Sequence, residues 1–318
     1  MKTYLLASAT ALALALPSAA MACSGCSCSL STDGQSLGLG NEPGLRLDYR
    51  FDYINQNQLR QGGGTAKEAL PVPHETERKT VSMYHTLGID YAPNNDWGIN
   101  VQVPYWVRYH DTVQANATSD IKSSYTDLSD VRIVGRWHGL FDDKNTGLLL
   151  GAKLPTGRTH RTWKDASNGT LDASLQPGSG TTDLILGLTH TVPLAEDWAA
   201  FGQAQWQKAL TRHNDFKPGD AYTATVGVRW QATETFMPQL QVNGVVNARD
   251  SWSSARDNTG GDPDNSGNWA VYLSPGLGIK LNDQMTAFVF GQIPVYQYVN
   301  GYQLAPYYKA SAMISYKF

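Results

Sequence analysis

The C-terminal segment, residues 304–318, alternates between two kinds of side chain with a period of two. Counting back from the terminal Phe318, one set is apolar or small: Tyr316, Ile314, Ala312, Ala310 and Tyr308. The other set is mostly polar: Lys317, Ser315, Ser311 and Lys309, with Met313 as the exception. Successive side chains of a β-strand point to opposite faces, so this segment predicts a strand with one apolar and one polar face that ends at the chain terminus.

The same alternation recurs along the chain and predicts about twelve amphipathic strands. They are roughly 44–55, 79–92, 96–110, 128–140, 145–155, 181–192, 197–208, 220–232, 235–248, 268–281, 284–297 and 304–318. Tight connections follow the even-numbered strands and mostly long ones follow the odd-numbered strands, which is typical of an even-stranded barrel with both termini periplasmic. We therefore expect an all-β, transmembrane, antiparallel up-and-down β-barrel in the bacterial outer membrane.

Two further features agree with a barrel in lipid. The closing strand resembles that of bacterial outer-membrane barrels, where a terminal Phe serves as the signal for the barrel assembly machinery. Large aromatic residues also fall near the strand ends, where amphipathic rings lie at the lipid headgroups. They are Tyr91, Trp97, Trp137, Trp198, Trp230, Phe236, Tyr316 and Phe318 at one end, and Tyr53, Tyr109, Trp206, Tyr222, Trp269 and Tyr308 at the other.

The N-terminus has the pattern of a secretory signal peptide. Lys2 precedes a short apolar run, and Ala20-Met-Ala22 has the form of a cleavage site. We expect residues 1–22 to be removed, residues 23–43 to form a cysteine-containing periplasmic or plug segment, and residues 44–318 to form the barrel. The net charge of −3 gives no reason to expect nucleic-acid binding. The absence of H-E-x-x-H, G-x-S-x-G and P-loop motifs favours a protein that is not an enzyme.

Charged residues fall on the face opposite the apolar one, where they would line a wet lumen, because charges facing lipid cost about 2–4 kcal/mol each near the midplane. The candidate lumen and selectivity residues are Arg46, Arg50, Arg108, Arg132, Arg136, Arg229 and Asp183. Two readings remain open at this point. An excess of cations would favour anions, or the Arg and Asp side chains would pair across strands and hold the barrel's shape.

The strongest motif joins two segments around a long connection. Lys153-Leu-Pro-Thr-Gly157 ends one strand, and Pro177-Gly-Ser-Gly-Thr-Thr-Asp183 leads into the next. This pattern resembles the phenol-degradation meta-pathway family of outer-membrane barrels, distant relatives of channels for long-chain fatty acids and aromatic hydrocarbons. The resemblance implies transport of small solutes, including aromatic or hydrophobic compounds. A lateral exit for apolar cargo would need a kinked strand, and Pro104, Pro238, Pro275 and Pro294 are candidates.

The three cysteines lie together as Cys23-Ser-Gly-Cys26-Ser-Cys28. The thiolates suit a soft ion such as Cu or Zn, or a redox disulfide. Alternatively, Cys23 is lipidated after cleavage, or two of the cysteines form a structural disulfide. The sequence therefore predicts an outer-membrane channel for small solutes. Its alternative is a metal-binding or thiol-redox protein that uses Cys23, Cys26 and Cys28 on a barrel scaffold.

Overall fold

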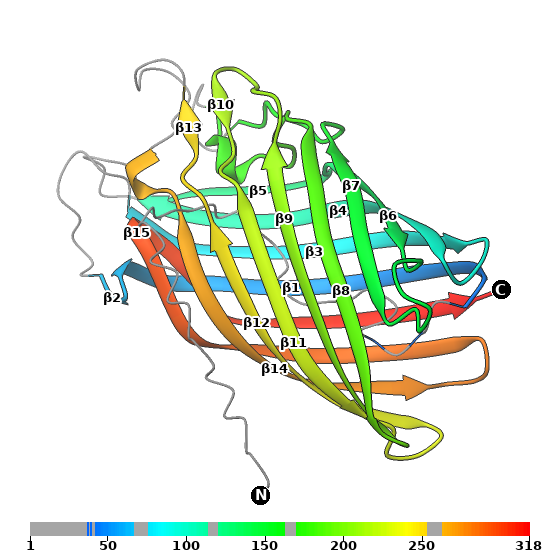
Figure 1. Ribbon diagram of the computed structural model, residues 1–318. Helices are drawn as coiled ribbons and strands as arrows, with labels where there is room; N and C mark the ends of the chain where they lie inside the picture. The colour runs from blue at the N-terminus through cyan, green and yellow to red at the C-terminus, as the bar shows by residue number, and fades with distance from the viewer. Residues whose placement is uncertain are drawn as a thin grey trace, which may run out of the picture.

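The computed structural model describes residues 37, 39, 42–66, 76–113, 120–162, 170–252 and 263–318. Their antiparallel strands close into a barrel (Figure 1). The prediction of an all-β antiparallel barrel is confirmed. Among the described residues, no helix has the length and apolar character needed to span a membrane. The cysteine cluster and the cleavage site lie outside the described residues.

The bounds of the barrel strands agree with the sequence periodicity to within a few residues at most positions. The strands are β1 (Gly44–Gly62), β3 (Thr76–Ala92), β4 (Trp97–Val113), β5 (Asp120–Leu128), β6 (Val131–Trp137), β7 (Thr146–Leu154), β8 (Asp183–Ala195), β9 (Trp198–Ala209), β11 (Ala221–Trp230), β12 (Phe236–Asn247), β14 (Asn268–Lys280) and β15 (Met285–Lys317). Five short elements lie between them: β2 (Gly64–Thr65), η1 (Ala173–Leu175), β10 (Phe216–Lys217), β13 (Ser251–Trp252) and η2 (Pro263–Asn265). Figure 1 shows β2, β10 and β13 at the end of the barrel away from the C-terminal residue.

The ring is closed by β15 and β1. Arg46 pairs with Lys317 and the register continues to Tyr53 opposite Ala310. The terminal Phe318 donates its backbone N–H to Leu45 O at 3.0 Å. Pairing of the last strand with the first closes the ring at this seam, which is the condition for exposing a sheet to lipid.

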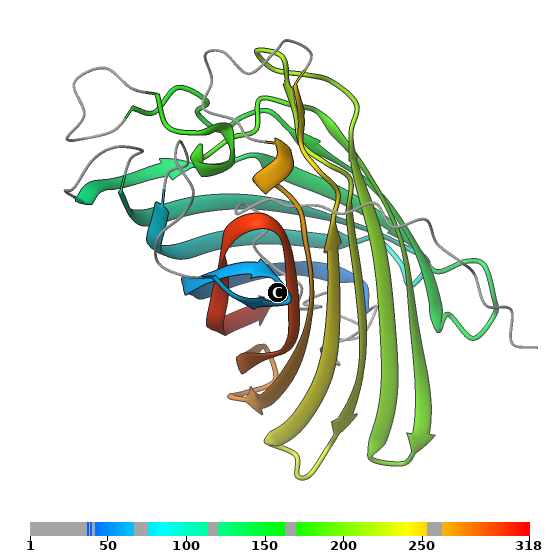
Figure 2. The ribbon, with the colours of Figure 1, turned by 90° about the vertical axis from the view of Figure 1, so that its left-hand side faces the viewer.

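The longest strand, β15, pairs with different neighbours along its length. Residues 286–299 pair with β14, and residues 299–317 pair with β1. Figure 2 shows β15, in red, turning back on itself beside the blue β1. Gly301 has a φ of 52°, in the left-handed region that favours glycine. The predicted loop at 298–303 is therefore a tight reversal within one continuous element.

The predicted strand 128–140 differs from the structure. Two elements, β5 and β6, occupy this part of the ring and both pair with β4. Ser129 and Asp130 interrupt them, and both side chains are buried. The interruption releases these two residues from the ladder to bind the connection between β7 and β8, as described below.

The outward face of the sheet is apolar around the ring. Leu150 and Val226 are each 62% exposed and Ile293 is 55% exposed, and comparable side chains occur on the other strands. An apolar belt of this extent is far larger than the patches that soluble monomers expose, and it is typical of contact with lipid.

The aromatic residues predicted at the strand ends form stacked pairs. Near the short turns, Trp198 stacks on Trp230 with ring centroids 5.5 Å apart. Toward the other end of the same strands, Trp206 stacks on Tyr222 at 6.5 Å. The two pairs lie eight residues apart in sequence on each strand, which is about 27 Å along a strand and about 20 Å along the axis of a barrel with tilted strands. That separation suits two headgroup layers on either side of a hydrocarbon core.

The strand prolines have unequal effects on the ladders. Pro104 and Pro238 keep partners in register, namely Thr86 and Leu277. Pro294 pairs with Tyr272, at a register shift between Val271 and Tyr272. Pro275 pairs with Leu240 of β12. On the β15 side, the register runs from Leu273–Ile293 to Gly276–Phe290, and among the described residues Ser274 and Pro275 have no pair there. The β14–β15 seam is therefore the locally weakened one, because Pro275 has no N–H to donate.

Candidate functional site

The interior of the barrel contains a cavity of about 220 Å³. Its wall combines charged, amide and aromatic side chains with the backbone of two inward-folded connections. The lining includes Arg50, Asp52, Tyr84, Gln102, Trp106, Asp130, Arg132, Ser174, Gln176, Ser179, Lys153, Asp183, Gln205, Gln207, Phe216 and Asn247. Alternation brings these side chains inside, because residues facing the cavity are separated by residues of the apolar outer face. The cavity is the candidate site for a passing solute.

The connection between β7 and β8 narrows the lumen because Asp130 holds it against the wall. Oδ1 of Asp130 accepts the N–H of Gly157 at 3.0 Å. Oδ2 accepts the N–H of Ser179 at 2.9 Å and its hydroxyl at 2.8 Å. Lys153 completes the group, with Nζ 3.2 Å from Asp130 Oδ2 and 3.0 Å from Asp183 Oδ2. The single carboxylate thus binds both ends of the connection.

The two halves of the sequence motif meet at this point. A Cβ on Gly178 would lie 2.4 Å from Gly157 O, and a Cβ on Gly157 would lie 2.7 Å from Gly178 Cα. The backbone N–H of Gly178 also donates to Arg158 O at 2.8 Å. The glycines are therefore required for backbone-to-backbone contact. Asp183 accepts from Thr181 at 2.7 Å and from Gln207 at 2.6 Å, so it points inward as predicted.

Arg108 serves the same connection and does not face the open lumen. It is fully buried, and Nη1 donates to the carbonyls of Ser174 and Leu175 at 3.3 Å each. Nη2 donates to Tyr84 OH at 3.0 Å, and the guanidinium carbon lies 4.7 Å from the Trp106 ring centroid. The guanidinium of Arg108 therefore binds the wall and η1, and its assignment as a selectivity residue stays a prediction.

Apolar contacts and hydroxyls support the docking. Leu171 and Leu175 pack on Tyr125 of β5. The Tyr125 hydroxyl donates to Leu175 O, and the Ser129 hydroxyl donates to Pro177 O at 2.5 Å. The inward position of residues 171–179 is therefore part of the packed structure.

A second charged group lies on β1, β3 and β6, toward the short turns. Arg136 binds Asp90 with two hydrogen bonds, Nη1 to Oδ2 at 2.5 Å and Nη2 to Oδ1 at 2.7 Å. Arg46 Nη2 is 3.6 Å from the same carboxylate and its Nε is 3.1 Å from Asp48. Two cations and two anions thus balance, with Ser315 donating to Asp48 at 2.6 Å. Paired charges of this kind hold adjacent strands in register.

The remaining candidate cations differ in their surroundings. Arg50 pairs with Asp52 at 2.8 Å. Arg132 is half-buried, lines the cavity and stands opposite Lys153 on β7 and Gln102 on β4. Arg229 is half-buried on β11, opposite Gln239. For Arg46, Arg50 and Arg136 the structure favours the interpretation that Arg and Asp side chains pair and hold the barrel's shape. Arg132 is the candidate best placed to act on a solute.

The function of Asp130 as an anchor was missed by the sequence analysis. The signal was present in the motif, since a loop that re-enters through Gly178 and Gly180 needs an acceptor for its free N–H groups. No metal site forms among the described residues, as no group of three or more His, Cys, Asp and Glu gathers there. The metal prediction for Cys23, Cys26 and Cys28 stays a prediction, because these residues are outside the described ranges.

Comparison with known proteins identifies the fold. No protein-family model matches the sequence, and no curated sequence matches it significantly. Among solved structures, an outer membrane channel from Pseudomonas putida F1 aligns with a TM-score of 0.63 at 11% identity, covering 87% of this chain and 96% of that one. The CymD monoaromatic hydrocarbon channel aligns with a TM-score of 0.45 at 8% identity, covering 91% and 94%. The NanC porin gives 0.45 at 11%, covering 86% and 100%. The first likeness shows that the fold is that of an outer-membrane barrel.

Proposed function

We propose that this protein is an outer-membrane channel that passes small solutes without changing them chemically. The observation that carries the proposal is a closed barrel with an apolar outer belt around a cavity of about 220 Å³ with a polar lining. A lipid-facing exterior and a wet interior are the two properties that a pore of this class requires.

We propose twelve membrane crossings, as expected from the sequence. The strand pairing supports this number when β5 and β6 are counted together as one crossing and β15 as two. Glu42, just before β1, and Phe318, after β15, lie at the same end of the barrel, since Lys317 binds Glu42. We place this end, which also carries the short turns, in the periplasm.

The docked connection limits the size of the cargo, and the side chains of the cavity wall limit its chemical class. The cavity presents the ring systems of Trp106, Tyr84 and Phe216 beside the cations Arg132 and Lys153. This combination suits a small molecule with an aromatic or apolar part and an anionic group, because rings offer stacking surfaces and guanidinium groups bind carboxylates. Arg132, a cation of the cavity wall, is the proposed selectivity residue.

The test is single-channel recording of the refolded protein in a planar bilayer under a salt gradient. Discrete openings are expected, and Arg132→Gln lowers the anion preference measured from the reversal potential. Lys208→Gln is the matched control, because Lys208 lies on the outer face beside Trp206, with Nζ 5.6 Å from the ring centroid. Absence of openings would overturn the channel proposal, and equal reversal potentials for Arg132→Gln and wild type would overturn the role of Arg132.

A further inference from the structure

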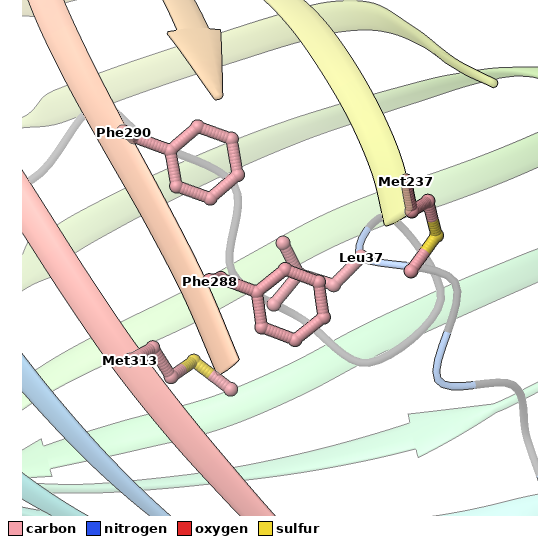
Figure 3. Close-up of a cluster of buried hydrophobic side chains, with 5 residues drawn as sticks. All are labelled: Leu37, Met237, Phe288, Phe290 and Met313. Atoms are coloured by element: carbon pink, nitrogen blue, oxygen red, sulfur yellow. The ribbon is translucent and has the colours of Figure 1, made fainter. Parts of the chain in front are cut away.

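One patch of the inner wall breaks the rule that the interior is polar. Met237 of β12, Phe288 and Phe290 of β15, and Met313 near the end of β15 are all buried and face one another across the lumen side of the sheet (Figure 3). Each is at most 8% exposed. The patch lies toward the short turns that join β11 to β12 and β14 to β15.

The two phenyl rings are held in place by the barrel itself. A Cβ on Gly276 would lie 2.1 Å from Phe290 Cδ1, and one on Gly278 would lie 2.9 Å from Phe288 Cε1. Both rings therefore rest directly on the backbone of β14, where any larger residue would displace them. The apolar surface is thus shaped in advance by two neighbouring strands.

A side chain from outside the strand ladder fills this surface. Leu37 is 0% exposed and sits among the four side chains (Figure 3). A weak hydrogen bond of 3.4 Å runs from Gln239 Nε2 to Leu37 O. Leu37 therefore holds its place mainly by burying apolar area.

A polar atom at the same position lacks a partner. Gln239 is 5% exposed, and its amide nitrogen is bonded to Leu37 O, so the amide lies beside Leu37. Its Oε1 is buried and accepts no hydrogen bond from any described residue. A buried acceptor without a donor costs about 1–3 kcal/mol, and a ligand that donates one hydrogen bond would remove this cost.

We propose that Met237, Phe288, Phe290, Met313 and Gln239 form a binding site inside the barrel for a small apolar or aromatic molecule with one hydrogen-bond donor. Leu37 occupies the site and is displaced by that molecule, whose donor binds Gln239 Oε1. The inference rests on the proposed channel function, because a ligand reaches this wall through the lumen. It adds a second point of contact to the charged cavity.

The test uses a cysteine reporter in the full chain with Cys23, Cys26 and Cys28 replaced by Ser. Met313→Cys is labelled with a charged methanethiosulfonate reagent, with and without indole. Indole slows the labelling. In Leu37→Ala the indole concentration needed for this protection is roughly ten- to a hundredfold lower, because the leucine side chain that competes with indole for the site has been removed. Met237→Cys serves as a second reporter should Met313→Cys fail to fold.

The controls separate this site from other effects of the probe. Indene is nearly isosteric with indole but has no hydrogen-bond donor, so it protects more weakly. Gln239→Leu removes the difference in protection between indole and indene. At Thr223→Cys, on the cavity wall, Leu37→Ala leaves the indole concentration needed for protection unchanged. Absence of protection at Met313→Cys in Leu37→Ala, or an equal effect of Leu37→Ala on protection at Thr223→Cys, overturns the site. Single-channel recording of the same preparations reports on the channel separately: openings without protection refute the site alone, and protection without openings refutes the channel alone.

Discussion

The connection between β7 and β8 should loosen when Asp130 is removed. Its carboxylate accepts three hydrogen bonds, from Gly157 N and from Ser179 N and Oγ, and it also pairs with Lys153. Asp130→Ala deletes all of these contacts at a site that is 5% exposed. Among the described residues, no other acceptor binds the backbone N–H groups of Gly157 and Ser179, so both lose their hydrogen-bond partner in this variant.

The size of the effect follows from the burial. Removing one partner of a buried, hydrogen-bonded charge pair costs about 3–5 kcal/mol. With every 1.4 kcal/mol equal to a factor of ten, local opening of residues 171–182 should become roughly a hundred- to a thousandfold more frequent. Tyr125 and Arg108 still bind Leu175, and Ser129 still binds Pro177, so these contacts limit the opening. The barrel strands pair independently of the connection and remain folded.

Hydrogen–deuterium exchange followed by mass spectrometry measures this directly. Peptides covering residues 171–182 should exchange faster in Asp130→Ala, and single-channel records should show larger and noisier conductance. Asp48→Ala is the matched control, since Asp48 is another inward carboxylate, bound to Arg46 and Ser315 and distant from the connection. If exchange of these peptides in Asp130→Ala equals that in Asp48→Ala, Asp130 does not anchor the connection.

Two further predictions concern the barrel wall and the motif. Arg136→Met should lower the free energy of unfolding by about 3–5 kcal/mol, because it removes both short hydrogen bonds to Asp90 and leaves this carboxylate with the Asn100 hydrogen bond at 3.2 Å and the longer Arg46 contact. Arg136→Lys should recover part of the loss in urea titrations in lipid vesicles. No change in the midpoint for either variant would contradict the pairing account. Gly178→Ala should raise single-channel conductance, because its Cβ would lie 2.4 Å from Gly157 O and would push the connection away from its docked position. Gly202→Ala is the control and should behave as wild type, since the atom nearest to its Cβ would be 3.7 Å away. Equal conductance in the two variants would refute the close-packing argument.

The ring and its faces were predictable because both depend on local periodicity. On β1, the alternation of Arg46, Asp48, Arg50 and Asp52 with apolar residues gives the inner face directly. The pairing Arg46–Lys317 was also predictable in outline, since the last strand of a closed barrel must meet the first.

The break at Ser129 and Asp130 was not predictable from the pattern. Their partners are Pro177 and Ser179, almost fifty residues away, and local alternation contains no information on such a contact. The burial of Arg108 was not predictable for the same reason, because its position on the inner face is periodic but its burial depends on η1. Around Phe288 and Phe290, Val289 is apolar as well, so a period of two cannot assign a face there. Met313 was the one visible sign of an apolar inner wall.

On β12 the charged cavity and the apolar patch lie at different depths, and they meet at the β1–β15 seam, where Arg50 of the cavity wall pairs with Met313. This arrangement has a consequence for transport. Val245 and Asn247 line the cavity, whereas Met237 lies eight to ten residues earlier on the same strand, about 27–34 Å along it. With the short turns in the periplasm, a solute would meet Arg132 and the aromatic rings first and the patch last. A molecule with both an anionic and an apolar part could then exchange one kind of contact for the other during passage. Weak binding at successive sites allows a solute to enter and still leave, so strengthening the hold at either site should slow transport even as binding improves.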